Sequence, residues 1–160
     1  MWVFTRSGSN WTQQGEKLIP NDEVSGLSGV GFGSSVALSS HGNTALIGGP
    51  SDHFEPFTGG AAWIFTRGRS TWTQQGPKLI AHTDFGEGPV DFGARVSLSG
   101  DGNTALIGGE FCHHCDGRGW VFKRSGTAWV QRAELTGVRM RGIGLAELGT
   151  SRFRRMQTRL

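Results

Sequence analysis

Hydrophobic and polar positions alternate along short stretches of this chain, as they do in half-buried β-strands. In residues 32–39, Val36 and Leu38 are separated by smaller residues, and residues 92–99 repeat the pattern. A period of two residues is typical of a strand with one buried face. Each stretch leads through a Gly-Asn turn into a second apolar run, at residues 44–47 in the first copy. The pattern predicts short strands joined by tight hairpins, in which glycine adopts positive φ.

Two longer segments recur almost unchanged, which indicates that the chain is built from repeats. Residues 42–49 are identical to residues 102–109, and residues 11–19 differ from residues 72–80 at one position. All six tryptophans occupy two positions of the repeat, namely Trp2, Trp63 and Trp120 at the first and Trp11, Trp72 and Trp129 at the second. The period is 57 to 61 residues. Repeated large aromatic residues are usually core, so we expect them to pack between neighbouring units.

Each repeat is predicted to hold four short strands. In the first complete copy they are residues 32–39, 44–47, 61–66 and 72–80, with a variable loop at residues 50–60 between the second and the third. The matching loop of the second copy is residues 110–119. Four antiparallel strands in each repeat are typical of a propeller blade. We therefore expect an all-β fold: a partial β-propeller with four-stranded antiparallel blades of about 60 residues.

The repeats also set the expected domain boundaries. Residues 1–20 are predicted to be the second half of a blade, residues 21–81 and 82–136 two complete blades, and residues 137–160 a basic tail. Closure is how a propeller removes open sheet edges, and it takes four to eight blades. Further blades or self-association are therefore expected to be needed to close the ring.

The tail is interpreted as a frame-shifted, disordered segment. The repeat stays in step up to Leu135 and then changes to an Arg-rich run that has no Phe-Gly pair. The codons GCG GAT GCA AAC ACG GCT C encode the repeat-like segment Ala-Asp-Ala-Asn-Thr-Ala. Read one nucleotide later, they encode Arg-Met-Gln-Thr-Arg-Leu, which is the sequence of residues 155–160. The alternative is a genuine basic tail that binds an acidic partner.

Composition and charge favour many tight turns over a nucleic-acid-binding surface. Gly accounts for 27 of the 160 residues, roughly twice its average usage. The formal net charge is +3, but residues 139–160 hold six Arg and one Glu, so the first 138 residues carry ten basic and twelve acidic groups. We therefore expect no nucleic-acid partner for the repeats. No apolar run is long enough for a membrane helix, so no membrane insertion is expected, and residues 1–6 do not resemble a signal peptide.

With these motifs the chain resembles the FG-GAP repeat family, which forms the blades of the integrin alpha-chain propeller and of many bacterial surface and secreted proteins. The Phe-Gly signature is matched by Phe32-Gly33 and Phe92-Gly93, and the Gly-Ala-Pro signature by Gly48-Gly49-Pro50. The second copy has Gly108-Gly109-Glu110 at that place. The resemblance covers residues 1–136 and favours the bacterial branch. It implies an extracellular or cell-surface location.

The resemblance also implies a non-catalytic binding or scaffold module that serves adhesion or the recognition of a protein or glycan. Its recognition surface is expected on the segments that vary between repeats, at residues 21–30, 50–60, 82–90 and 110–119. The alternative is a fragment of a propeller hydrolase or lectin whose active site lies on blades outside this chain. We do not expect an enzyme, because neither a Gly-x-Ser-x-Gly motif nor a phosphate loop occurs.

Loop carboxylates are the remaining candidates for hydrolytic chemistry, which needs two of them facing one substrate. They show no matched spacing between repeats, and we interpret all of them as solvated charges: Asp22, Glu23, Asp52, Glu55, Asp84, Glu87 and Asp91.

Calcium is usual in the FG-GAP family, but its loop is not seen here. Residues 99–103 contain one carboxylate and residues 39–43 none, whereas Ca²⁺ takes six to eight oxygen ligands. We expect plain hairpin turns and no cofactor at these places. The cluster with metal-ligand chemistry is Cys112, His113, His114 and Cys115. These residues could give zinc two thiolates and a histidine, yet a closed site needs four ligands and there is no second Cys pair. A local disulfide and ordinary loop residues are the alternatives.

Overall fold

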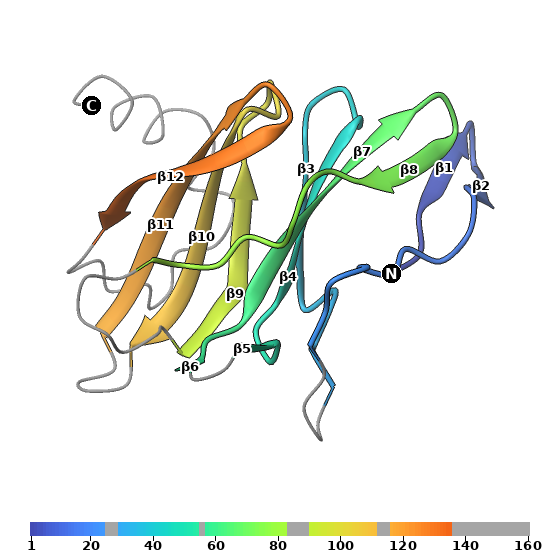
Figure 1. The fold of residues 1–160 in the computed structure, drawn as a ribbon. Helices are drawn as coiled ribbons and strands as arrows, with labels where there is room; N and C mark the ends of the chain where they lie inside the picture. Colours follow the sequence, from blue (N-terminus) through green and yellow to red (C-terminus); the bar gives the residue numbers. More distant parts are fainter. Residues whose placement is uncertain (25–28, 55–56, 83–89, 112–115, 136–160) are drawn as a thin grey trace.

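The computed structural model of the chain describes residues 1–24, 29–54, 57–82, 90–111 and 116–135, and these residues form strands and turns without a helix (Figure 1). The strands are β1 (Phe4–Ser7), β2 (Asn10–Gln13), β3 (Ser35–Leu38), β4 (Thr44–Gly49), β5 (His53–Phe54), β6 (Phe57–Thr58), β7 (Ala61–Gly68), β8 (Thr71–Gln74), β9 (Val90–Leu98), β10 (Thr104–Phe111), β11 (Asp116–Ser125) and β12 (Ala128–Leu135). The expected tail, residues 137–160, lies outside the described residues.

The strands form two sheets of four and two sheets of two, all with antiparallel pairing. The larger sheets have the orders β3-β4-β7-β8, called blade 1 below, and β9-β10-β11-β12, called blade 2. The smaller sheets are β1-β2 and the hairpin β5-β6. Blade 1 and blade 2 stand side by side as open sheets (Figure 1). The predicted all-β fold, a partial propeller with four-stranded antiparallel blades, is confirmed.

The pair β1-β2 matches the third and fourth strands of each blade. A pairing of Arg with Trp recurs in the same register in all three sheets: Arg6 with Trp11, Arg67 with Trp72, and Arg124 with Trp129. In each pair the guanidinium lies over the indole, at 5.8, 5.7 and 5.2 Å from the ring centroid. The cation–π contact explains why Arg and Trp recur together in each repeat.

The fourth strand of blade 1 is shorter than predicted. Residues 72–80 were expected to form one strand, but β8 ends at Gln74. Gly76 follows with φ of 72°, and Gly15 follows β2 with φ of 71° although Glu16 stands there in place of Pro77, so the turn at this glycine interrupts the ladder. Pairing resumes at an isolated bridge between Leu79 and Ala62. In blade 2 the matching strand β12 continues to Leu135, with one register shift on the way.

The variable segments contain more strand than predicted. The segment 50–60 holds the small hairpin β5-β6. The expectation of a loop at residues 110–119 is wrong at both ends, because β10 continues to Phe111 and β11 begins at Asp116, where these two residues pair. The ladder is made by backbone groups, so it can continue beyond the last apolar side chain.

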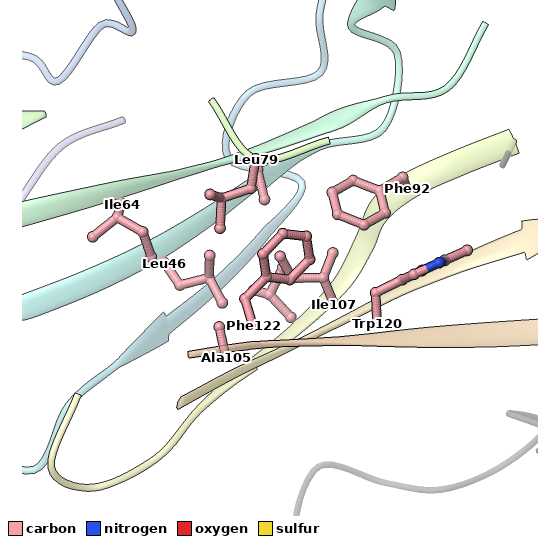
Figure 2. Close-up of a cluster of buried hydrophobic side chains, with 10 residues drawn as sticks. Leu46, Ile64, Leu79, Phe92, Ala105, Ile107, Trp120 and Phe122 are labelled. Atoms are coloured by element: carbon pink, nitrogen blue, oxygen red, sulfur yellow. The ribbon is translucent and has the colours of Figure 1, made fainter. Parts of the chain in front are cut away.

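Blade 1 and blade 2 pack face to face through one apolar cluster (Figure 2). Blade 1 contributes Leu46, Ala62, Ile64 and Leu79, and blade 2 contributes Phe92, Val96, Ala105, Ile107, Trp120 and Phe122. A second cluster on the other face of blade 1 contains Trp63 and Phe65, and Val3, which directly precedes β1, packs against it. Trp63 and Trp120 are fully buried, so the first tryptophan of the repeat is core, as expected.

The Phe-Gly signature of blade 2 fits against the Gly-Gly signature of blade 1. A Cβ on Gly48 would overlap the Gly93 carbonyl oxygen and lie 2.9 Å from its carbon, so no larger residue fits there. The same oxygen accepts a 2.7 Å hydrogen bond from the Ser35 hydroxyl. Gly93 has φ of 92°, in the region that favours glycine. The close contact between the two blades therefore requires glycine at positions 48 and 93.

The phenylalanine of the signature packs within its own blade. The Phe32 ring lies 5.4 Å from that of Trp63, and the Phe92 ring lies 5.3 Å from that of Trp120, in edge-on geometry both times. The signature thus does two things: its aromatic ring covers the buried tryptophan of the repeat, and its glycine lets the next blade approach closely.

Candidate functional site

The antiparallel order of the strands sorts the connections onto two ends of the blades. The tight turns within β1-β2, β3-β4, β7-β8, β9-β10 and β11-β12 lie at one end, which we call the turn end. The connections β2-β3, β4-β7, β8-β9 and β10-β11 lie at the opposite end, the loop end (Figure 1). The four segments predicted as a recognition surface all belong to the loop end. Residues 25–28, 55–56, 83–89 and 112–115 of these segments lie outside the described residues.

A polar network fixes the described part of the β2-β3 connection over the loop end of blade 1. Asp22 is its centre. Its carboxylate accepts hydrogen bonds from Trp63 Nε1 at 2.8 Å, from Gln74 Nε2 at 2.9 Å and from the backbone N–H of Lys78 at 2.7 Å. Trp120, at the position that matches Trp63, has no partner for its buried Nε1 among the described residues. Residues 83–89, which follow His82 in the matching connection, lie outside the described residues.

Asp52 forms the buried half of the same network. Its side chain is fully buried and makes an ion pair with Lys78, while its other oxygen accepts a 2.8 Å bond from the backbone N–H of Val24. The interpretation of Asp52 as a solvated loop charge is thus wrong. A buried carboxylate must be paired and hydrogen-bonded to offset its lost hydration, and Lys78 and Val24 provide both. Asp52 and Asp22 together tie the β2-β3 connection to blade 1.

The surroundings of Asp22 change its acidity. Burial acts to raise the pKa of the carboxyl, but the hydrogen bonds from Lys78, Gln74 and Trp63 and the charge of Lys78 together lower the pKa below its ordinary value. The unfolded chain therefore takes up this proton at a higher pH than the native chain. Ionised Asp22 stabilises the fold above about pH 4, and this stabilisation is lost as the pH falls through the lowered native pKa.

We expect Asp22→Asn to weaken the pH dependence of stability in acid. The free energy of unfolding of the unchanged chain should fall steeply as the pH drops from about 4 to 2. The variant should be less stable at neutral pH and should show a shallower fall over that range, because it has no proton to take up at this position. Urea unfolding at several pH values measures both. Parallel pH profiles for the two chains would show that Asp22 contributes nothing through its charge.

Two grooves lie where the segment that follows the last strand of one sheet meets the last strand of the next sheet. The larger has a volume of about 940 Å³ and is lined mainly by residues 75–80 and 127–134. The smaller has about 600 Å³ and is lined mainly by residues 14–19 and 70–74. Every residue that lines the smaller groove has a counterpart one repeat later in the larger groove, which is lined in addition by Asp22, Arg132, Ala133 and Glu134. A binding surface formed by these grooves would therefore recur once in each repeat.

Hydrogen bonds that recur with the repeat hold the walls of each groove together. Trp72 Nε1 donates to Gln14 Oε1 and Trp129 Nε1 to Gln75 Oε1, both at 3.1 Å. The backbone N–H of Asn21 and of His82 donates to the side-chain oxygen of Gln74 and Gln131 in the same way, at 3.0 and 2.9 Å. The second tryptophan of the repeat is thus a cross-link between blades as well as a half-buried wall of the groove. Indole and amide groups are suited to binding a neutral polar ligand.

The hairpin turns at residues 39–43 and 99–103, where the family's calcium loop would lie, form internal hydrogen bonds. Gly42 and Gly102 have φ of 64° and 70°, as the predicted hairpin turns require. Asp101 accepts from the Ser99 hydroxyl at 2.5 Å and from the Asn103 N–H at 3.0 Å. The hydroxyl of Ser99 is the main reason that the pKa of Asp101 is lowered. The Asp101 carboxylate therefore makes its hydrogen bonds within the turn.

Metal-ligating residues do not gather elsewhere in the part of the chain that the structure describes: no group of three or more His, Cys, Asp or Glu is placed to hold an ion. Cys112, His113, His114 and Cys115 lie outside the described residues, in the segment that joins β10 to β11. The prediction made for them stays a prediction.

Asp52 and Lys78 were missed because the sequence offers little signal for them. Lys78 has a counterpart at Lys17, but Asp52 has no counterpart in the other copy. A feature that occurs once in a repeat protein cannot be found by comparing the copies. The contact between Asp52 and Lys78 is evident only from the three-dimensional structure.

No helix among the described residues is long and apolar enough to cross a membrane. No protein-family model matches this chain, and no curated protein matches it.

Proposed function

We propose that this chain is a non-catalytic binding or scaffold module of an FG-GAP β-propeller, which recognises a protein or glycan ligand at the cell surface. The Phe-Gly and Gly-Gly-Pro signatures and the four-stranded repeat support this assignment. The observation that carries it is the position of the variable segments: all four connect strands at the loop end, whereas the turns at the other end are short.

The loop end is better suited to ligand recognition than the turn end, because its connections are longer and vary between the repeats. Connections held by a rigid scaffold can vary in sequence without disturbing the core, so binding residues are frequently found there. Blade 1 supplies such a scaffold, since Asp22 and Asp52 anchor the β2-β3 connection through Trp63 and Lys78. Glu23, Ser51 and His82 are exposed at this end and available to a ligand.

The proposal is tested by binding of the purified chain to a glycan array and to a panel of extracellular proteins. We expect saturable binding to one ligand class. The triple variant Glu23→Ala, Ser51→Ala, His82→Ala should bind at least about tenfold more weakly, which corresponds to about 1.4 kcal/mol. A matched variant at the turn end, Ser9→Ala, His41→Ala, Ser125→Ala, should bind like the unchanged chain.

Equal loss of binding in both variants, or no saturable ligand in either panel, would contradict a recognition role for the loop end. Cleavage of a bound glycan would instead favour the alternative, a propeller hydrolase. The products of each array spot are therefore analysed by mass spectrometry alongside the binding signal.

A further inference from the structure

Two aromatic residues at the start of the N-terminal sheet, Trp2 just before β1 and Phe4 within it, are exposed although their counterparts in both blades are core. Trp2 is 50% exposed, whereas Trp63 and Trp120 at the same repeat position are fully buried. Phe4 is 53% exposed, and its counterparts Phe65 and Phe122 are buried. In the blades the ring of the Phe-Gly signature covers this pair, from Phe32 in blade 1 and from Phe92 in blade 2. Among the residues that the structure describes, no such ring packs against Trp2 and Phe4.

The edge of β1 is open where the matching strands are paired. Among the described residues β1 pairs with β2 alone, whereas β7 lies between β4 and β8, and β11 between β10 and β12. The N–H of Arg67 donates to Asn43 O and that of Arg124 to Asn103 O, both at 2.9 Å. Because hydrogen-bonding direction alternates along a strand, the N–H groups of Phe4 and Arg6 point to the open edge.

The apolar surface continues from this edge onto β3. Val36 and Leu38 are 55% and 58% exposed, although Val96, the counterpart of Val36, is only 4% exposed. Val96 is covered by the cluster that contains Leu46 of β4 in the preceding blade. The interface between blade 1 and blade 2 therefore shows, position by position, what would cover Val36: a strand of the β4 type that is paired with β1.

We propose that the open edge of β1 and the exposed face of Val36 and Leu38 form a docking site for one β-hairpin of the β3-β4 type. The second strand of the hairpin, Thr-Ala-Leu-Ile-Gly-Gly, pairs with β1 in the register that β4 adopts on β7. Its leucine covers Val36 and Leu38, and its Phe-Gly ring covers Trp2 and Phe4. This is strand addition to a sheet edge, in which the backbone gives affinity and the side chains give specificity. The inference rests on the fold and is independent of the proposed ligand recognition.

Trp11 provides an internal control, because a hairpin of this type does not reach its position. Trp72 and Trp129 instead donate hydrogen bonds to Gln14 and Gln75, which follow the fourth strand of the preceding sheet. Trp11, at the same repeat position, is 65% exposed. It should stay exposed when the hairpin binds, while Trp2 becomes covered.

The experiment adds a synthetic peptide of residues 29–50 to the full chain and follows backbone amide exchange by NMR. At saturating peptide, exchange of the Phe4 and Arg6 amides should slow at least about tenfold, while that of Thr5, which points toward β2, should not change. A control peptide that carries Leu46→Asp and Ile47→Asp should slow neither. A chain with residues 29–61 fused ahead of Met1 tests the same pairing without a second molecule.

The proposal is overturned if neither the peptide nor the fusion slows exchange at Phe4 and Arg6, or if the Asp-substituted peptide acts equally. Protection of both amides in the chain alone, increasing with its concentration, would assign the edge to a second copy and would also overturn the hairpin as occupant. Burial of Trp11 together with Trp2 would show that a whole blade face is covered instead.

Discussion

Replacing Trp120 with alanine should lower the free energy of unfolding by about 3–5 kcal/mol. Its indole is fully buried in the cluster between blade 1 and blade 2, and the Phe92 ring packs edge-on against it. The cavity left behind would be lined by residues on rigid strands of both blades, which limits how far the site can collapse. Urea unfolding of the purified variant measures the loss.

The repeat offers a matched control for this substitution. Trp2 occupies the same repeat position, just before β1, but is half exposed, so Trp2→Ala should cost less than about 1 kcal/mol. Equal losses for the two variants would mean that repeat position, rather than contact between blades, sets the contribution of this tryptophan.

Gly48→Ala should be destabilising by about 3 kcal/mol, at the upper end for an overpacked site. The added methyl group would overlap the carbonyl oxygen of Gly93 on the next blade. That oxygen belongs to the backbone and also accepts the Ser35 hydroxyl bond, so the blades would have to move apart to relieve the clash.

Gly68→Ala is the control for the loss of a glycine from a strand. Gly68 ends β7, and a Cβ built there has no atom within 4 Å. The change should be neutral or slightly stabilising, because alanine reduces the conformational freedom of the unfolded chain. An equal shift of the thermal unfolding temperature in both variants would show that position 48 does not require glycine for the close approach of the blades.

The repeat made much of the fold predictable. Alternating apolar positions and the turns between them predict the four strands of each repeat, and the recurring tryptophans and Phe-Gly pairs establish the repeat itself. The burial of Trp63 and Trp120 follows from the same pattern. What the sequence could not supply is the cause: Gly48 is needed because Gly93 approaches it from another blade, a contact between residues 45 positions apart.

The remaining differences arise where the two copies diverge. The turn at Gly76 ends the ladder of β8, whereas β12 has no glycine there and continues through a bulge at the matching place. Asp52 is buried because Lys78 and the N–H of Val24 compensate its charge, and the second copy has no carboxylate at the matching position. Local pattern determines a repeated strand well, but an ion pair formed once depends on tertiary contacts that no periodicity encodes.

The two complete repeats fold as separate sheets that pack face to face. This arrangement is tested most directly by nuclear Overhauser contacts between methyl and aromatic protons across the cluster of Figure 2. We predict cross-peaks from the methyl groups of Leu46, Ile64 and Leu79 in blade 1 to the rings of Phe92, Trp120 and Phe122 in blade 2. Cross-peaks within each blade without any between the two groups would contradict the account.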